Sequence, residues 1–121
     1  MFNSHVHGNV TGTGTALFCC IGFEPSHIEF YNSDGLVVAK WSAIAGALVG
    51  VKVADAGAAT NVAAMVAGIT TYAGGDAGSA AHVDRLGTAI AATATTVSGF
   101  QIGTDADLNA AAQEIFYCAF R

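Results

Sequence analysis

Acidic and amide side chains alternate in the stretch GTDADLN, residues 103–109, as Asp105, Asp107 and Asn109. A calcium loop of the EF-hand type presents its first oxygen ligands at this spacing, but it also needs glycine at the sixth position and glutamate at the twelfth. Those positions hold Ala110 and Phe116 here. Asp and Asn also accept hydrogen bonds from nearby backbone N–H groups in tight turns. We therefore interpret the stretch as a turn and assign no metal ligand to it, with a weak calcium site of another type as the alternative.

His5 and His7 are separated by one residue, so on an extended strand both imidazoles lie on the same face. Such a pair is a common half of a transition-metal site. A complete site needs His27, His82 or a cysteine from elsewhere in the chain, and the sequence does not show that these side chains converge. We predict that His5 and His7 are exposed or lie at an interface, and metal binding stays the alternative.

Three cysteines, Cys19, Cys20 and Cys118, leave an odd number for disulfide pairing. The adjacent Cys19 and Cys20 point to opposite faces of a strand, which makes a shared metal site improbable. A Cys118–His27 pair could act as nucleophile and base, but Cys118 lies in the most apolar segment, where buried thiols are inert. The hydrolase, phosphate-loop and Rossmann motifs are missing from the sequence. We predict reduced, buried thiols in a protein that is not an enzyme and needs no cofactor.

The chain has 121 residues, of which 53% are hydrophobic and only 11% are charged, with a net charge of −5. Ordinary globular domains carry about 25% charged residues, so a surface with so little charge is difficult to keep soluble unless partners cover it. The four basic residues are scattered, which argues against nucleic-acid binding. The longest apolar run, residues 43–51, is about half a membrane span. We therefore predict neither a nucleic-acid nor a membrane partner.

A hairpin is the clearest local pattern. Residues 26–31 alternate between an apolar face and a second face. The second face carries His27, Glu29 and Tyr31. The NSDG sequence of residues 32–35 predicts a turn with Gly35 at positive φ, and residues 36–42 form the returning strand. Tyr31 and Trp41 flank this hairpin as candidate contact anchors, with packing across the sheet face as the alternative.

Two segments are apolar on both faces, which is unusual in a small antiparallel sandwich because one sheet face normally meets water. In residues 114–121 one face carries Ile115, Tyr117 and Ala119, and the other carries Phe116, Cys118 and Phe120. Residues 15–21 (TALFCCI) repeat the pattern. We expect the second apolar face to be covered by other copies of the protein or by a larger body on which it sits.

The remaining segments are less regular. Residues 1–14 show no apolar periodicity and predict an extended arm, followed by one domain over residues 15–121. Residues 43–99 are rich in Ala and Gly; the helical spacing of NVAAMVAGI competes with frequent glycine and β-branched residues. We predict strands near residues 47–53, 62–71 and 89–97, and a loop at residues 73–84. The fold class is an all-β, jelly-roll-like small antiparallel β-sandwich with an arm and an Ala/Gly-rich middle.

Two segments resemble a pattern in structural proteins of tailed bacteriophages: GFEPSHIEFYN, residues 22–32, and GFQIGTDADLNAAAQEIFYCAFR, residues 99–121. In those proteins a G-F-x-P turn leads into a strand, and a G-F-x-I/L-G-x-D/N-x-x-x-N motif precedes a final aromatic strand. Capsid decoration proteins and tail-fibre modules share the pattern, which covers a little over a quarter of this chain. The resemblance implies a small β-sandwich that works by assembly, without catalytic residues, in which GTDADLN places the last strand.

With this resemblance, we expect a viral structural protein, a capsid decoration or cement protein that is made in the host cytoplasm and located in the virion. We expect a homo-oligomer, specifically a trimer, that binds the major capsid protein and lays its arm along a neighbour. A tail-fibre or receptor-binding module is the second interpretation, and a metal-dependent or thiol enzyme is a third. The expected interface residues are His5, Val6, His7, Tyr31, Trp41, Phe116 and Phe120.

Overall fold

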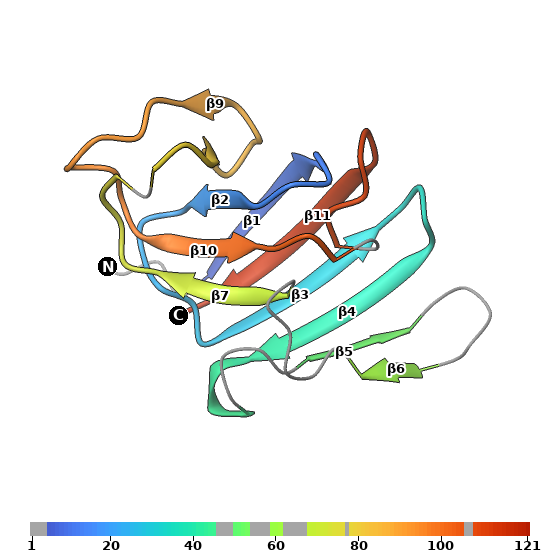
Figure 1. The fold of residues 1–121 in the computed structure, drawn as a ribbon. Coiled ribbons are helices and arrows are strands. Elements are labelled where there is room, and N and C mark those ends of the chain that lie inside the picture. Colours follow the sequence, from blue (N-terminus) through green and yellow to red (C-terminus); the bar gives the residue numbers. More distant parts are fainter. Residues whose placement is uncertain (1–4, 46–49, 54–58, 62–67, 77, 106–107) are drawn as a thin grey trace.

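The structure is a computed structural model that describes residues 5–45, 50–53, 59–61, 68–76, 78–105 and 108–121. In these residues two β-sheets pack face to face, which confirms the prediction of an all-β sandwich (Figure 1). A single turn of 3₁₀ helix, η1 (Ala43–Ala45), follows the fourth strand. Of the strands expected near residues 47–53 and 62–71, residues 47–49 and 62–67 lie outside the described residues, and the described remainder contains the strands Gly50–Val53 and Ile69–Tyr72.

The larger sheet has six strands, and every neighbouring pair is antiparallel. Its spatial order is β1 (His5–Thr11), β11 (Glu114–Phe120), β3 (His27–Asn32), β4 (Val37–Ser42), β5 (Gly50–Val53) and β6 (Ala59–Asn61). The smaller sheet has five strands in the order β7 (Ile69–Tyr72), β10 (Gly99–Ile102), β2 (Leu17–Cys20), β8 (Ala81–Val83) and β9 (Ala89–Ile90). It departs from a purely antiparallel sandwich, because β8 pairs in parallel with β2.

The core lies between the sheets and is built from the alternate residues that face inward. Phe30 of β3 and Phe100 of β10 are both almost completely buried, and their rings meet edge to face with centroids 6.0 Å apart. Tyr117 of β11 adds a third ring, 5.0 Å from that of Phe100. Aromatic pairs at such spacings add stabilisation beyond the apolar area that they bury. The predicted inner face of β11 is confirmed, since Ile115, Tyr117 and Ala119 are all buried.

The predicted hairpin is β3–β4, and its turn differs from expectation in one detail. Asn32 closes the turn by accepting hydrogen bonds through Oδ1 from the backbone N–H groups of Asp34, at 3.1 Å, and Gly35, at 2.8 Å. The positive φ that we expected at Gly35 belongs instead to Leu36, at 54°. Asn32 carries the turn because a short amide side chain can imitate the backbone hydrogen bond of a tight turn.

The expected N-terminal arm is corrected by the structure for residues 5–11. These residues form β1, the edge strand of the six-stranded sheet, and pair with β11 of the same chain from His5↔Phe120 to Thr11↔Glu114. The strand does have an inward face, made of Val6, Gly8 and the buried Val10. Because Gly8 has no side chain, the apolar pattern of this strand was not evident in the sequence. Glycine is required at this position, because a Cβ atom there would lie 2.3 Å from Cζ of Tyr117.

The middle of the chain also differs from the sequence prediction. The strand expected over residues 89–97 is reduced to β9, two residues long, and the loop expected over residues 73–84 contains β8. Threonine side chains close the turn that replaces the end of the expected strand: the N–H of Thr93 donates to Oγ1 of Thr96 at 2.7 Å. Local hydrogen bonds of this kind compete with strand pairing, so a β-branched composition alone overstates the strand length.

The outward face of β2 is covered by its own chain, which corrects the expectation that another copy covers it. Phe18 and Cys20 point away from the core and form a second buried cluster with Tyr72. The buried imidazole of His82 stacks on Phe18 with ring centroids 4.7 Å apart, and its Nδ1 lies 2.8 Å from the carbonyl oxygen of Ala80. The Tyr72 hydroxyl donates to the carbonyl oxygen of Gly75. The strand is therefore apolar on both sides because side chains of its own sheet, Tyr72 of β7 and His82 of β8, pack against its outward side.

Candidate functional site

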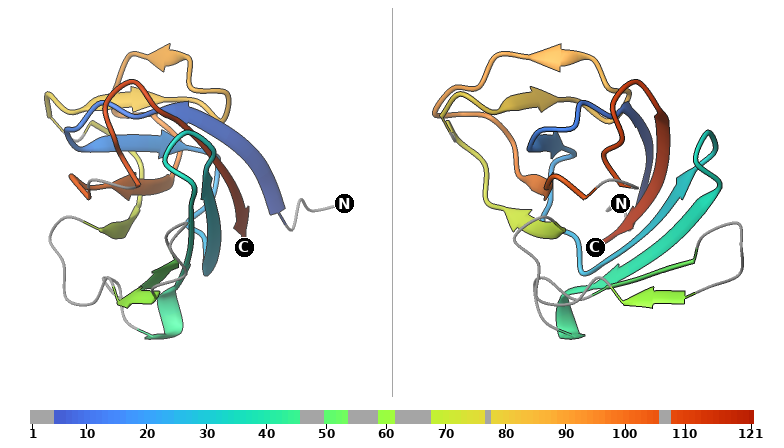
Figure 2. Two further views of the ribbon diagram at one scale, coloured as in Figure 1. Left: turned by 90° about the vertical axis from the view of Figure 1, so that its right-hand side faces the viewer. Right: turned by 45° about the vertical axis from the view of Figure 1, so that its right-hand side comes forward.

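The outer face of the six-stranded sheet is the strongest candidate site, and by this term we mean the outward side chains of β1, β11, β3 and β4. The smaller sheet covers the opposite, inward face of these strands (Figure 2). Strand pairing sets the outward side chains in rows that cross the sheet from β1 to β4. Three of these rows carry side chains able to bind a partner.

The first row is aromatic and basic. Phe120 of β11 pairs with His5 on one side and with His27 on the other. The ring centroid of Phe120 is 5.9 Å from that of His5 and 5.5 Å from that of His27. The two imidazoles therefore flank one phenyl ring. The main chain supports this corner of the sheet, because the N–H of Ser26 donates to the carbonyl oxygen of Phe120 at 2.8 Å.

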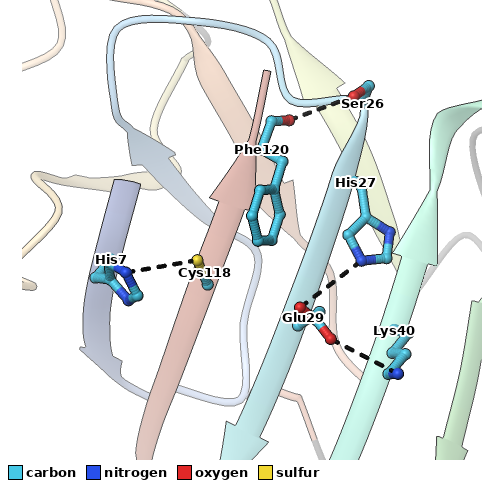
Figure 3. A network of polar contacts seen from close by, with 7 residues as sticks. All are labelled: His7, Ser26, His27, Glu29, Lys40, Cys118 and Phe120. Carbon is cyan, nitrogen blue, oxygen red and sulfur yellow. Dashed lines mark hydrogen bonds and ion pairs between the residues drawn. The ribbon is translucent and has the colours of Figure 1, made fainter. Parts of the chain in front are cut away.

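The second row is polar, and it contains a thiol (Figure 3). Nε2 of His7 lies 3.9 Å from Sγ of Cys118. Glu29, on the other side of Cys118, has Oε1 3.6 Å from Nζ of Lys40 and Oε2 4.0 Å from Nε2 of His27. Burial raises the pKa of the Cys118 thiol, and the Glu29 carboxylate raises it further. Beside the thiol, the row holds one acidic side chain, Glu29, and one basic side chain, Lys40.

The third row is apolar and open to solvent. Phe116 of β11, Tyr31 of β3 and Val38 of β4 are 44%, 56% and 49% exposed. The rings of Phe116 and Tyr31 meet edge to face, with centroids 6.0 Å apart. A shallow groove runs between this row and His7, Glu29 and Cys118 of the second row. These apolar side chains lie together on neighbouring strands, so the row is a candidate contact surface.

The structure brings five of the seven expected interface residues together on this outer face. They are His5, His7, Tyr31, Phe116 and Phe120. The other two face inward. Trp41 is 3% exposed and belongs to the core, so its alternative interpretation, packing within the sandwich, is the correct one. Val6 is partly buried and packs against the same core.

The GTDADLN stretch forms a turn around a buried amide. Oδ1 of Asp105 accepts a hydrogen bond from the N–H of Leu108 at 3.0 Å, and the backbone oxygen of Asp105 accepts one from the N–H of Asn109 at 2.9 Å. Nδ2 of Asn109 donates to the carbonyl oxygens of Thr15, at 2.6 Å, and Gly103, at 2.8 Å. Its Oδ1 accepts from the N–H of Thr13 at 2.8 Å. The turn therefore ties the C-terminal region to the β1–β2 connection; Asp107 lies outside the described residues.

The proposed nucleophile and base do not pair. Cys118 lies in register with His7 and Glu29, whereas His27 lies in register with Phe120. The raised pKa of the Cys118 thiol opposes thiolate formation, which a nucleophilic cysteine needs. Cys19 and Cys20 are free and buried, as predicted, but Cys118 is only half-buried. Within the described residues, no group of three His, Cys, Asp or Glu side chains is placed to hold a metal ion.

Five residues of the three rows were absent from the expected interface: His27, Glu29, Val38, Lys40 and Cys118. The alternation of residues 26–31 placed Glu29 on the same side of its strand as Tyr31, so this alternation was sufficient to predict that Glu29 belongs to the outer face. Val38 and Lys40 follow from the hairpin register, which pairs Val38 with Tyr31 and Lys40 with Glu29. This register depends on the turn that follows Asn32. From the sequence we expected the positive φ of that turn at Gly35, whereas it occurs at Leu36.

Comparison with protein-family models, with curated proteins and with solved structures finds no match for this chain. The resemblance to structural proteins of tailed bacteriophages therefore stays a prediction from the two quoted segments. Among the described residues there is no helix of sufficient length and apolar character to cross a membrane.

Proposed function

We propose that this protein is a structural protein that works by self-association through the outer face. The observation that carries the proposal is the apolar row of Phe116, Tyr31 and Val38, three half-exposed side chains side by side on three strands. Burial of apolar surface stabilises association by about 25 cal/mol for each Å² removed from water. The opposite charges of Glu29 and Lys40 lie in the adjacent row, so a second copy in a two-fold arrangement meets complementary charges.

We further propose that the oligomer is a capsid decoration protein in the virion of a tailed bacteriophage, with the major capsid protein as its second partner. Pairing of two outer faces about a two-fold axis gives a dimer, in place of the trimer that we expected from the sequence. The support is the resemblance of residues 22–32 and 99–121, together with the low charge of the chain. Repeated over a shell, modest contacts become strong through avidity. A tail-fibre or receptor-binding module is the second candidate, because it shares the same sequence pattern.

Self-association can be tested with one substitution and a matched control. Phe116→Lys places a charge in the apolar row, whereas Val97→Lys alters a similarly exposed side chain on the β9–β10 connection, whose backbone bonds to Ile21 and Gly75. Light scattering after size exclusion should give an oligomer for the wild type and for Val97→Lys, and a monomer for Phe116→Lys. A monomeric wild type at high concentration, or an oligomer that Phe116→Lys leaves intact, would contradict the proposal.

The decoration role is tested by the copy number of the protein in purified virus particles, measured by quantitative mass spectrometry against the main shell protein. A ratio near that of the shell protein supports decoration. A few copies in each particle support the tail-fibre alternative instead. Absence from the particles overturns both viral roles and leaves self-association to be judged by the light-scattering experiment alone.

We propose no catalytic activity for the outer face. The Cys118 thiol is its one candidate nucleophile among the described residues, and both burial and the Glu29 carboxylate raise the pKa of that thiol. An activated cysteine has its pKa lowered by a cation or a helix N-terminus.

A further inference from the structure

We propose that His7 and Cys118 form half of a zinc site, and that a second copy of this chain supplies the other half. The inference rests on the proposed self-association and names what holds two copies together. Both side chains belong to the second row of the outer face, His7 on the edge strand β1 and Cys118 on β11 beside it (Figure 3).

The distance between the two ligand atoms suits zinc. Nε2 of His7 is 3.9 Å from Sγ of Cys118. In a tetrahedral site, a nitrogen at about 2.1 Å and a sulfur at about 2.3 Å from the metal are separated by about 3.6 Å. A shift of a few tenths of an ångström in either side chain is enough to reach that value. The imidazole is exposed and the thiol half-buried, so the pair is accessible to an ion and to a partner.

The pair supplies two of the four ligands that a structural zinc site needs. The nearest candidates in the same chain are otherwise engaged. The ring of His5 packs edge-on against that of His7, with centroids 5.1 Å apart, and also contacts Phe120. The Glu29 carboxylate lies between Lys40 and His27. A second copy related by a two-fold axis brings its own His7 and Cys118, and the complete set is two cysteines and two histidines, a common set for structural zinc.

The charges and protons of such a site balance. Each Cys118 thiol releases its proton to solvent as it binds, and the two resulting thiolates neutralise the two charges of one Zn²⁺ ion. In the free chain the Glu29 carboxylate opposes ionisation of Cys118. A bound divalent cation is a larger local charge and reverses that balance. The apolar row of Phe116 and Tyr31 lies on one side of the site and Phe120 on the other, so the partner's contact excludes water around the metal.

The test starts from protein freed of metal by a chelator, adds ZnCl₂ in excess over the chain and removes the unbound metal by gel filtration. The expected result is a doubling of mass by light scattering and one zinc for every two chains by elemental analysis. CoCl₂ in place of zinc should give a thiolate-to-cobalt charge-transfer absorption band. Cys118→Ser and His7→Ala should abolish the mass change and the absorption band. Val97→Lys, on the connection between β9 and β10, should retain both.

Several outcomes would overturn the zinc site. These are the absence of zinc binding, a stoichiometry of one zinc for each chain, and retention of zinc-driven association in Cys118→Ser. Circular dichroism of each variant establishes that the sandwich is intact. Association that persists in chelator and is removed by Phe116→Lys overturns the zinc site while it supports the proposed function. A chain that stays monomeric with and without zinc overturns both.

Discussion

The side-chain amide of Asn109 donates to the carbonyl oxygen of Thr15 at 2.6 Å, although the two residues are 94 positions apart in the chain. The same amide is 1% exposed and also bonds Gly103 and the N–H of Thr13. One buried side chain thus connects the turn before β11 to the connection between β1 and β2. Each of these two connections joins a strand of one sheet to a strand of the other.

Replacement of Asn109 is expected to destabilise the protein. Asn109→Ala leaves two carbonyl oxygens and one N–H group without their partner, and the expected loss is about 2–4 kcal/mol in the free energy of unfolding. Asn109→Asp keeps the acceptor for Thr13 and loses the two donated bonds, so it is also destabilising. Urea denaturation measures the loss. The exposed Thr104→Ala is the control, and an equal midpoint for all four proteins would contradict this role of Asn109.

Calcium is expected to leave the stability unchanged. Oδ1 of Asp105 already accepts a backbone hydrogen bond, and both polar atoms of the Asn109 side chain are occupied and buried. A calcium ion would have to replace these bonds to gain its oxygen ligands. Thermal unfolding in millimolar calcium and in chelator should give the same midpoint. A higher midpoint in calcium, lost in Asp105→Asn, would restore the calcium interpretation of GTDADLN.

Removal of residues 1–9 is expected to destabilise the fold, in contrast to the behaviour of a free arm. The truncation deletes five of the seven register pairs between β1 and β11, from His5↔Phe120 to Asn9↔Phe116. It also exposes the hydrogen-bonding edge of β11, which favours aggregation. The comparison is a variant that lacks residues 1–4 only and so retains β1. Equal urea midpoints for the two truncated proteins would show that β1 contributes nothing to the sandwich.

Stability is expected to fall at alkaline pH. Burial is the main cause that raises the pKa of Cys19 from its ordinary value of 9.0 and the pKa of Tyr117 from 10.0. The unfolded chain loses these protons near the ordinary values while the folded chain retains them. The contribution of both groups is therefore complete below about pH 9 and is lost as the pH rises toward the folded pKa, by about 1.4 kcal/mol for each group and pH unit.

Tyr117→Phe is the informative variant for this pH dependence. The Tyr117 hydroxyl is buried and has no hydrogen-bond partner among the described residues, so its removal should be neutral or stabilising at pH 7. It should also make the alkaline loss less steep. Urea midpoints between pH 7 and 11 measure both effects, and a parallel profile for Tyr117→Phe and wild type would contradict the assignment.

Local sequence patterns were sufficient to predict the parts of the fold that depend on residues close together in the chain. The alternation of residues 26–31 and 114–121 predicted which side chains of β3 and β11 face the core, and NSDG predicted the hairpin. The outer face follows from the same alternation. His5, His7 and Phe120 were expected at an interface, and pairing of β1 with β11 explains why they lie together.

The remaining features depend on contacts between distant segments. β1 was missed because Gly8 interrupts its apolar face, and the need for glycine arises only when Tyr117 packs over it. The two apolar faces of β2 suggested a partner molecule, whereas Tyr72 and His82 of the same chain provide the cover. No local pattern identifies which distant segment lies over a strand. For the same reason the contact of His7 with Cys118 was not predicted.

The pairing of His5 with Phe120 also has a kinetic consequence. The two residues are 115 positions apart (120 − 5), and β11 lies between β1 and β3, so neither neighbour of β11 is close to it in the chain. Folds dominated by such distant contacts have a high contact order and fold in milliseconds to seconds. The entropy of loop closure grows only with the logarithm of loop length. Lengthening of an exposed connection between strands should therefore change equilibrium stability little, while the search that brings β11 between its two neighbours determines how fast the sheet forms.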